Sequence, residues 1–257
     1  MTLVVTTASA HGITVVGDRA VTRRTSDDVT ILEARKVWYS PTANIGLAFW
    51  GNVYLPDSSM ESWTQEFVNG ITKKDTVSSI AERLASSLNA VLEPLGLYWS
   101  QLRRGIHVSG YEHGLPVIFH VHTGDPRAFH HALEVHRDFP DLLGGGVEKY
   151  QSLIEAGGRA QLRNGAYELF VTVATLAEQK RGELSALLKT PVPAPTLAGQ
   201  AAFDAALVRF SSDLIASADL PRTVGPDLDV VAFTANGQVV LSPAQPVDAP
   251  DPLQRVR

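Results

Sequence analysis

The sequence favours a single α+β domain, arranged as a four-layer sandwich in which two sheets lie between helical layers. Strand patterns open and close the chain, and helical patterns interrupt the strands in two places. No shift in composition marks a domain boundary, and no repeat of solenoid length occurs. We therefore expect one domain over residues 1–242 and a tail over residues 243–257, which contain four prolines.

The first elements are two pairs of strands. The Val- and Thr-rich start of the chain returns through a turn at residues 9–12, and a second pair ends at Gly51. Residues 23–34 between the pairs are polar and are expected to form a loop. The predicted strands are residues 2–8 and 13–17, then residues 36–40 and 43–49.

Two amphipathic helices are expected next. Ser58 and Glu61 have the spacing of a capping box, and Gly70 ends the first helix. Asp75 opens the second helix and Pro94 closes it. Apolar residues recur at intervals of three and four in both. They are Met60, Trp63, Phe67 and Val68, then Val77, Ile80, Leu84, Leu88 and Val91.

The second half of the chain repeats this order. Strands are expected over residues 105–110, 115–122 and 129–136. A glycine corner at 144–146 leads into a helical region from Glu148, and residues 174–188 either continue it or form a separate helix. Prolines 191, 193 and 195 interrupt the pattern before a helix that carries Phe203, Leu207, Phe210 and Leu214. Asn236-Gly237 predicts a closing hairpin of residues 229–234 and 238–241.

Composition restricts the function classes. The 257 residues have a formal net charge of −5 with no basic block, which argues against nucleic acid or an anionic membrane as the main partner. The chain has no cysteine, so disulfides and thiolate chemistry are excluded. No apolar run is long enough to cross a bilayer, and the first ten residues lack the charge and length of a signal peptide. We expect a cytoplasmic protein.

The N-terminus carries the clearest candidate chemistry. Thr2 follows the initiator methionine, and removal of Met1 would expose a residue with both a hydroxyl and an α-amine. An α-amine has a pKa near 8, so it can act as general base for its own hydroxyl. Asp18 ends the returning strand of the first hairpin and should lie near that amine. Lys36 opens the next strand, and its charge would lower the pKa of the hydroxyl.

Thr2, Asp18 and Lys36 lie in two stretches of sequence that resemble a known family. The stretch MTLVVTTASAHGITVVGDRAVT, followed by RKVWYSPTANIGLAFWG, resembles the opening of a proteasome β-type subunit. It is also similar to the bacterial proteasome-like threonine peptidase that works with an unfoldase ring. Both are N-terminal-nucleophile hydrolases with an αββα sandwich. VSGYEHGLPVIFHVHTGD and VGPDLDVVAFTANGQV resemble later strands of the family, so about two thirds of the chain is covered.

The resemblance implies a role for each matching residue. Thr2 would be nucleophile and base, with Asp18 and Lys36 tuning it. The amide of Gly51 would stabilise the oxyanion, and Thr22 would hold the substrate backbone as an added strand. Phe49 and Trp50 stand where the family lines the pocket for the substrate side chain, so two large aromatic rings would either narrow that pocket or pack in the core.

Two regions depart from the family pattern. Its Gly-Ser-Gly-Ser corner reads Gly144-Gly145-Gly146-Val147 here, without a hydroxyl. An Asp and a Ser that precede the closing hairpin in proteasome β subunits align with Pro221 and Val224. Asp219 or Thr223 would replace them only if the register shifts by one or two residues. The supporting residues around the nucleophile are therefore fewer than in the family.

Histidines form a second cluster. His120 and His122 alternate on one face of a predicted strand, and alternate strand residues can present two imidazoles to one metal. Adjacent residues such as His130 and His131 point to opposite faces, so both cannot join them. We therefore expect no metal site, and His107 is expected to be a hydrogen-bonded sheet residue.

The resemblance favours a threonine-type endopeptidase without a cofactor. It would act on polypeptides within a self-compartmentalised homo-oligomeric ring, with an ATP-dependent unfoldase as a candidate partner. A non-catalytic structural subunit is the second hypothesis, and it holds if Met1 stays attached to Thr2. The third is an N-terminal-nucleophile amidase that acts on a small amide.

Overall fold

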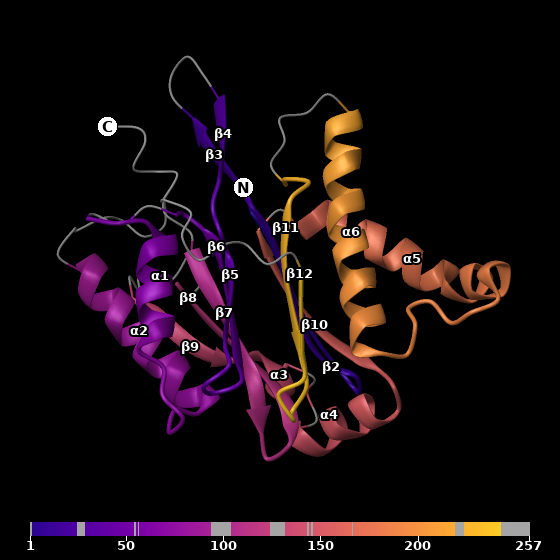
Figure 1. The fold of residues 1–257 in the computed structure, drawn as a ribbon, viewed down its shortest axis with the longest axis horizontal. Coiled ribbons are helices and arrows are strands. Elements are labelled where there is room, and N and C mark those ends of the chain that lie inside the picture. The colour runs from indigo at the N-terminus through magenta and orange to yellow at the C-terminus, as the bar shows by residue number, and fades with distance from the viewer. Residues whose placement is uncertain are drawn as a thin grey trace.

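The computed structural model combines helices with antiparallel sheets (Figure 1). The α+β class expected from the sequence is therefore confirmed. The predicted tail over residues 243–257 lies outside the described part of the chain. The structure describes residues 2–24, 29–53, 55, 57–93, 104–123, 132–142, 144, 146–165, 167–218 and 224–242.

The first hairpin lies inside a five-stranded sheet. Its two strands pair from Val4 opposite Gly17 to Ser9 opposite Gly12, so the predicted turn is confirmed. The closing hairpin around Gly237 is also confirmed, and it adds to the edge of this sheet. The strand order is β10 (Arg159–Gly165), β1 (Leu3–Ser9), β2 (Gly12–Asp18), β11 (Leu228–Phe233) and β12 (Val239–Ser242).

Strand β10 corrects the sequence analysis, which assigned its residues to a helical region. Only Ala160 and Leu162 are apolar between Arg159 and Asn164, so the segment has a weak strand pattern on its own. It becomes a strand because it pairs with β1 along its whole length, from Ser9 opposite Arg159 to Leu3 opposite Gly165. Pairing with a distant segment outweighs local preference here.

A second five-stranded sheet faces the first. Its order is β5 (Val37–Ser40), β6 (Ile45–Gly51), β7 (Arg104–Glu112), β8 (Leu115–Thr123) and β9 (Leu133–Arg137). A separate hairpin joins β3 (Ala20–Arg24) to β4 (Val29–Glu33). The loop predicted over residues 23–34 is therefore wrong in part, because residues 23–24 and 29–33 of this segment are paired strand residues.

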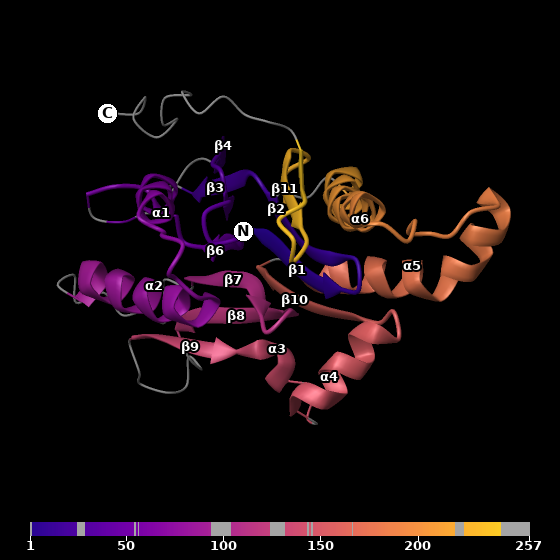
Figure 2. The same ribbon diagram turned by 60° about the horizontal axis from the view of Figure 1, so that its bottom comes forward.

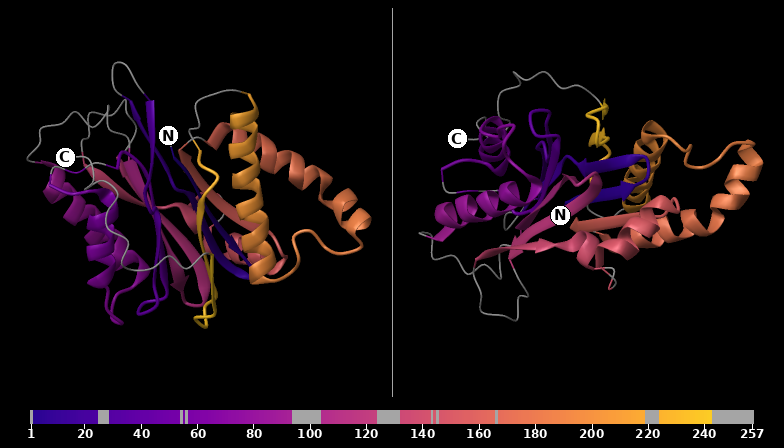
Figure 3. Two further views of the ribbon diagram at one scale, coloured as in Figure 1. Left: turned by 45° about the horizontal axis from the view of Figure 1, so that its top comes forward. Right: turned by 90° about the horizontal axis from the view of Figure 1, so that it is seen from below.

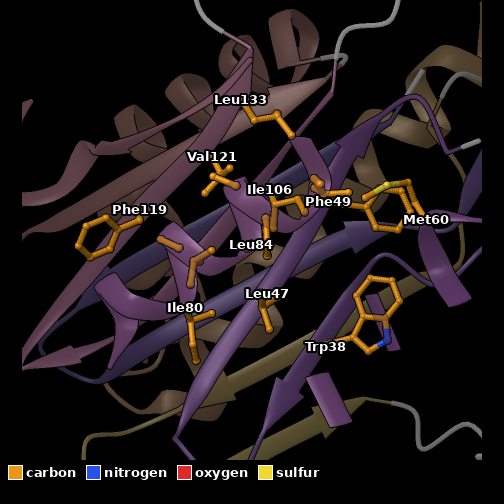
Figure 4. Packing of buried hydrophobic residues seen from close by; sticks show 14 of the residues in the cluster. Trp38, Leu47, Phe49, Met60, Ile80, Leu84, Ile106, Phe119, Val121 and Leu133 are labelled. Atoms are coloured by element: carbon orange, nitrogen blue, oxygen red, sulfur yellow. The ribbon is translucent and has the colours of Figure 1, made fainter. Parts of the chain in front are cut away.

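Helices α1 (Met60–Asn69) and α2 (Val77–Leu92) cover the outer face of the second sheet. Ser59 caps α1 by accepting from the Ser62 amide, whereas the sequence analysis placed the cap at Ser58. A capping box of Thr76 and Ser79 begins α2. Apolar residues of both helices pack on strands β5 to β9, and Figure 4 shows Ile80, Leu84 and Met60 among strand residues such as Leu47 and Val121.

The remaining helices lie away from α1 and α2, and α5 and α6 cover the outer face of the first sheet (Figures 2 and 3). Thr196 caps α6 directly after the proline-rich break. Helix α5 extends outward from the strands in these views. The four helices are α3 (Asp138–Asp141), α4 (Gly146–Glu155), α5 (Tyr167–Leu188) and α6 (Leu197–Ser217).

A third apolar cluster joins the inner faces of the two sheets. Val4, Val15 and Phe233 from the first sheet meet Val37 and Ala48 from the second. The two sheets therefore pack on each other through alternate residues of their strands. The four-layer αββα sandwich stays a prediction. No helix in the described ranges is long and apolar enough to cross a membrane.

Candidate active site at the start of the first strand

Thr2 lies at the inner face of the first sheet. Leu3 and Val5 point outward into the cluster under α5 and α6, whereas Val4 belongs to the cluster between the sheets. Because side chains alternate along a strand, Thr2 shares the inner face with Val4. It is 3% exposed. Thr2 therefore faces the second sheet at the beginning of β1.

Asp18 anchors the backbone next to Thr2. Its Oδ1 accepts from the Leu3 amide at 2.6 Å, and its Oδ2 accepts from the amides of Ala20 and Gly225, each at 3.1 Å. The side chain is fully buried. Both oxygens of this buried carboxyl group therefore have hydrogen-bond donors. The sequence prediction that Asp18 lies beside the start of the chain therefore matches the geometry.

Lys36 completes the buried pair. Its Nζ donates to Asp18 Oδ1 at 3.2 Å and to the Ala20 carbonyl at 2.5 Å. The side chain is fully buried, and this burial lowers the pKa of Lys36, with the charge of Asp18 opposing the effect. One carboxylate oxygen thus joins the Leu3 amide to the Lys36 ammonium. This places the ion pair one residue from Thr2.

Asp229 holds the backbone of Lys36. Its Oδ2 accepts from the Lys36 amide at 3.0 Å, and its Oδ1 lies 3.6 Å from Arg19 Nε. Burial raises the pKa of Asp229, and the Lys36 amide and the nearby cations oppose this. Arg19 therefore acts as a structural ion-pair partner of Asp229.

Gly165 is a part of this region that the sequence analysis did not identify. It stands opposite Leu3 at the end of β10 and has a φ of +95°. A Cβ built on Gly165 would lie 1.5 Å from the Thr2 carbonyl oxygen. Only glycine allows β10 to approach Thr2 this closely. A Gly in a polar segment is a common turn signal, so the sequence alone could not indicate this contact.

Gly51 is the last residue of β6, and Thr22 is the central residue of β3. Gly51 ends β6 opposite Arg104, and its φ of +89° is one that favours glycine. Thr22 pairs with Ile31 in the β3–β4 hairpin. Their roles toward an oxyanion and a substrate backbone stay predictions.

Phe49 and Trp50 lie on opposite faces of β6. Phe49 is buried under α1 and α2 and stacks on Trp38 with ring centroids 5.6 Å apart. Its ring therefore fills the core instead of narrowing a substrate pocket. Trp50 is on the inner face, where its Nε1 donates to His120 Nε2 at 3.0 Å and its indole covers Gly105.

Val224 aligns with a serine of the family and has no hydroxyl to place near Thr2. Its side chain is buried in the apolar cluster under α6, and its carbonyl accepts from Ser212 Oγ at 2.8 Å. The neighbouring Gly225 amide binds Asp18 instead. The other residues considered for these roles, Gly145, Asp219, Pro221 and Thr223, lie outside the described residues.

Histidines on the inner face of the second sheet form a continuous array. Ring centroids are 5.1 Å apart for His107 and His120, 4.1 Å for His120 and His122, and 4.5 Å for His122 and His136. Within the described residues, no group of three or more potential ligands could hold a metal ion. The His107 and His120 rings meet edge to face, those of His120 and His122 are tilted, and those of His122 and His136 are stacked.

The inner members of the array are held in the neutral form. His107 bonds Thr6 Oγ1 at 2.9 Å and Asn164 Oδ1 at 2.7 Å, which confirms the expected hydrogen-bonded sheet residue. Burial lowers the pKa of His107 to about 3, and burial also lowers the pKa of His120 well below its usual value. His120 Nδ1 lies 3.5 Å from Asp138 Oδ2, and burial raises the pKa of that carboxyl.

No family model and no curated protein matches this chain. Solved structures of Anbu do match it. The Anbu Gly-1 mutant from Hyphomicrobium sp. strain MC1 has a TM-score of 0.55 at 13% identity, over 93% of this chain and 85% of that chain. Anbu, an ancestral β-subunit, from Yersinia bercovieri has a TM-score of 0.54 at 12% identity, over 91% and 81%.

The comparisons correct the family assignment made from the sequence. The reported solved structures are Anbu proteins, not the proteasome β-type subunit or the bacterial threonine peptidase to which the sequence motifs pointed. At 12–13% identity, the likeness shows the fold alone. The chain is thus similar in fold to an ancestral β-subunit over most of its length.

Proposed function

We propose that this chain is a hydrolase of peptide bonds in which Thr2, after removal of Met1, is the N-terminal nucleophile. One observation carries the proposal most directly. Asp18 Oδ1 accepts from both the Leu3 amide and Lys36 Nζ, so a buried ion pair is fixed one residue from Thr2. The similarity in fold to an ancestral β-subunit adds support.

The proposed reaction is acyl transfer. Thr2 Oγ1 attacks the carbonyl carbon of the substrate peptide bond, and the α-amine of Thr2 accepts the hydroxyl proton. The amine then gives this proton to the leaving nitrogen, and an ester to Thr2 remains. Water, deprotonated by the same amine, hydrolyses the ester and restores the free hydroxyl. No cofactor is needed for these steps.

The neighbouring groups would assist by position and charge. The Lys36 ammonium would stabilise the developing alkoxide of Thr2. Its own pKa is lowered, which suits a side chain that assists a proton transfer. Asp18 fixes the position of the Lys36 side chain relative to the Leu3 amide, because both donate to its Oδ1. The Gly51 amide is proposed as the donor to the oxyanion, and Thr22 as a backbone contact for substrate.

The wider setting is part of the proposal. The two sheets and their covering helices would form a four-layer αββα sandwich, and copies of the chain would assemble into a closed ring in the cytoplasm. A ring would restrict access to unfolded polypeptides, which an ATP-dependent unfoldase could supply. Neither nucleic acid nor a membrane is proposed as a partner.

The test is intact mass spectrometry of the purified protein before and after treatment with an epoxyketone or β-lactone. The expected result is loss of Met1 and a single adduct. Thr2→Ala should form no adduct, Thr2→Ser should form one, and Thr172→Ala at an exposed position of α5 should behave as wild type. In a fluorogenic peptide assay, the wild type, Thr2→Ser and the control variant should cleave the peptide, and Thr2→Ala should not.

Two other outcomes identify the alternatives. Retained Met1 with no adduct, in a protein that still assembles, indicates a non-catalytic structural subunit. The buried apolar side chain of Val224, at a position where a hydroxyl was expected, favours this alternative. An adduct together with turnover of small amides but not of peptides indicates an amidase.

A further inference from the structure

A groove separates β10 from the helices that cover it. Two cavities, of about 340 and 280 Å³, lie along this groove and share Gly157, Arg159 and Arg181 in their walls. The groove runs beneath α5, from α6 to the turn at Ser9 and the proline-rich segment at Pro191–Pro195. It lies on the outer face of the first sheet, whereas Thr2 lies on the inner face.

Guanidinium groups dominate the polar wall of the groove. Arg159, Gln161 and Arg163 alternate along β10 and line the first cavity, and Arg181 enters from α5. Arg159 pairs with Asp204 at 2.5 Å, and Arg181 pairs with Glu178 at 2.9 Å.

Arg163 is the cation that remains. In the part of the chain that the structure describes, no salt bridge is found for Arg163, and its side chain is only partly exposed. With two of the three guanidinium groups paired, the groove has an excess of one positive charge.

Arg159 is preorganised to bind an acceptor. Its guanidinium lies over the ring of Phe203 at 5.4 Å, and Asp204 is itself held by Thr14 Oγ1 and Gln200 Nε2. The Nε of Arg159 is buried and has no acceptor among the described residues. A guanidinium held in this way can present its remaining N–H groups at the groove to a planar oxyanion.

The opposite wall of the groove is apolar. Ala174 from α5 and Phe203 and Leu207 from α6 line the first cavity. A ligand that fills it therefore needs an apolar body as well as a negative charge. Since the excess charge is one positive unit, a carboxylate matches it better than a phosphate dianion.

We propose that this groove binds a small carboxylate with a short apolar body. The carboxylate lies between Arg159 and Arg163, and the body lies against Phe203 and Leu207. The site is separate from the Thr2 region and does not depend on the activity proposed for Thr2.

The experiment is isothermal titration with four probes: hexanoate, acetate, hexanol and inorganic phosphate. Hexanoate should saturate one site with a Kd on the order of 1 mM. Acetate should bind at least about tenfold more weakly because it lacks the apolar body, and hexanol should show no saturable binding. Phosphate should bind more weakly than hexanoate.

Variants locate the site. Arg163→Gln should weaken hexanoate binding by about tenfold or more, and Ala174→Met, which keeps every charge, should weaken it by filling the cavity. Arg209→Gln is the matched control, because Arg209 is an exposed arginine on α6 outside the groove. Circular dichroism confirms that each variant is folded.

Three results would overturn the proposal. One is equal binding of hexanol and hexanoate, which would show an apolar surface without charge recognition. Another is binding that Arg163→Gln and Ala174→Met both leave unchanged, which would place the ligand elsewhere. The last is absence of saturable hexanoate binding to the wild-type protein. None of these results bears on the Thr2 adduct test.

Discussion

Two buried polar networks, one around Asp18 and Lys36 and one around His107 and His120, compensate in opposite ways for the loss of hydration. The Asp18–Lys36 network keeps full charges and pairs them, with four donors on one carboxylate. The histidine network around His107 and His120 stays neutral, because burial lowers the pKa of both rings.

This difference determines which change destabilises each network. A paired charge is stable until its partner is removed, since the remaining charge then has no compensation. A neutral histidine is stable until acid favours its protonated form in the unfolded chain. The first network should therefore respond to substitution and the second to pH.

The largest effect is expected for Asp18→Ala. It leaves three backbone amides without this acceptor and the buried Lys36 ammonium without its counter-charge, with only the Ala20 carbonyl still accepting from Nζ, and should lower the free energy of unfolding by about 3–5 kcal/mol. Urea unfolding followed by circular dichroism measures this. Asp213→Ala, at an exposed carboxylate of α6, should change it by less than about 0.5 kcal/mol. A loss under about 1 kcal/mol for Asp18→Ala would contradict the buried pair.

Acid should destabilise the protein through the histidine network. The folded pKa of His107 is about 3, below the ordinary value of 6.5, so its contribution is present above pH 6.5 and is lost as the pH falls below it. Each such histidine should remove about 1.4 kcal/mol of unfolding free energy per pH unit below that value.

The measurement is urea unfolding at a series of pH values between 7 and 5. His107→Gln should reduce the pH slope by about one proton. His113→Gln, in the exposed turn between β7 and β8, should leave it unchanged. An unchanged slope in His107→Gln would show that His107 is not the group responsible.

A smaller effect is expected when the hydrogen bonds of His107 are removed. His107→Leu leaves the Thr6 hydroxyl and the Asn164 amide without this partner and should cost about 1–3 kcal/mol at pH 7. A double-mutant cycle with Thr6→Val measures the Thr6–His107 coupling. Additive losses in the cycle would mean that the two side chains do not interact.

The smallest effect is expected for Trp50→Phe. This change keeps an aromatic ring and removes one hydrogen bond to His120, so it should cost about 0.5–1.5 kcal/mol. Because the indole N–H stabilises neutral His120, its loss should also raise the pKa of that ring. Proton NMR titration follows the change, and a lower pKa in the variant would contradict the assigned role.

Local patterns were sufficient for part of the fold. The turn signals at Gly12 and Gly237 predicted both hairpins, and the apolar spacing of α1 and α2 predicted both helices. The caps lie one residue later than predicted, at Ser59 instead of Ser58 and at Thr76 instead of Asp75, whose carboxylate accepts from the Thr72 amide and from Arg83.

Pairing between distant strands formed the elements and contacts that local sequence patterns did not predict. Strand β10 forms against β1, more than 150 residues earlier in the chain, and its Gly165 meets Thr2 only there. The same pairing brings Asn164 to His107. No local preference of the segment from Arg159 to Gly165 predicts these contacts, since they depend on a partner strand.

For the candidate site, the sequence by itself determined the separation of Thr2 and Asp18, because a hairpin of this length brings them together. It also indicated Lys36 as the cationic partner of Asp18, because this lysine stands at the start of the next strand pair. The tertiary structure alone decided which face each side chain takes. It directed Phe49 into the core and Trp50 toward His120, since face and pairing depend on how two sheets pack.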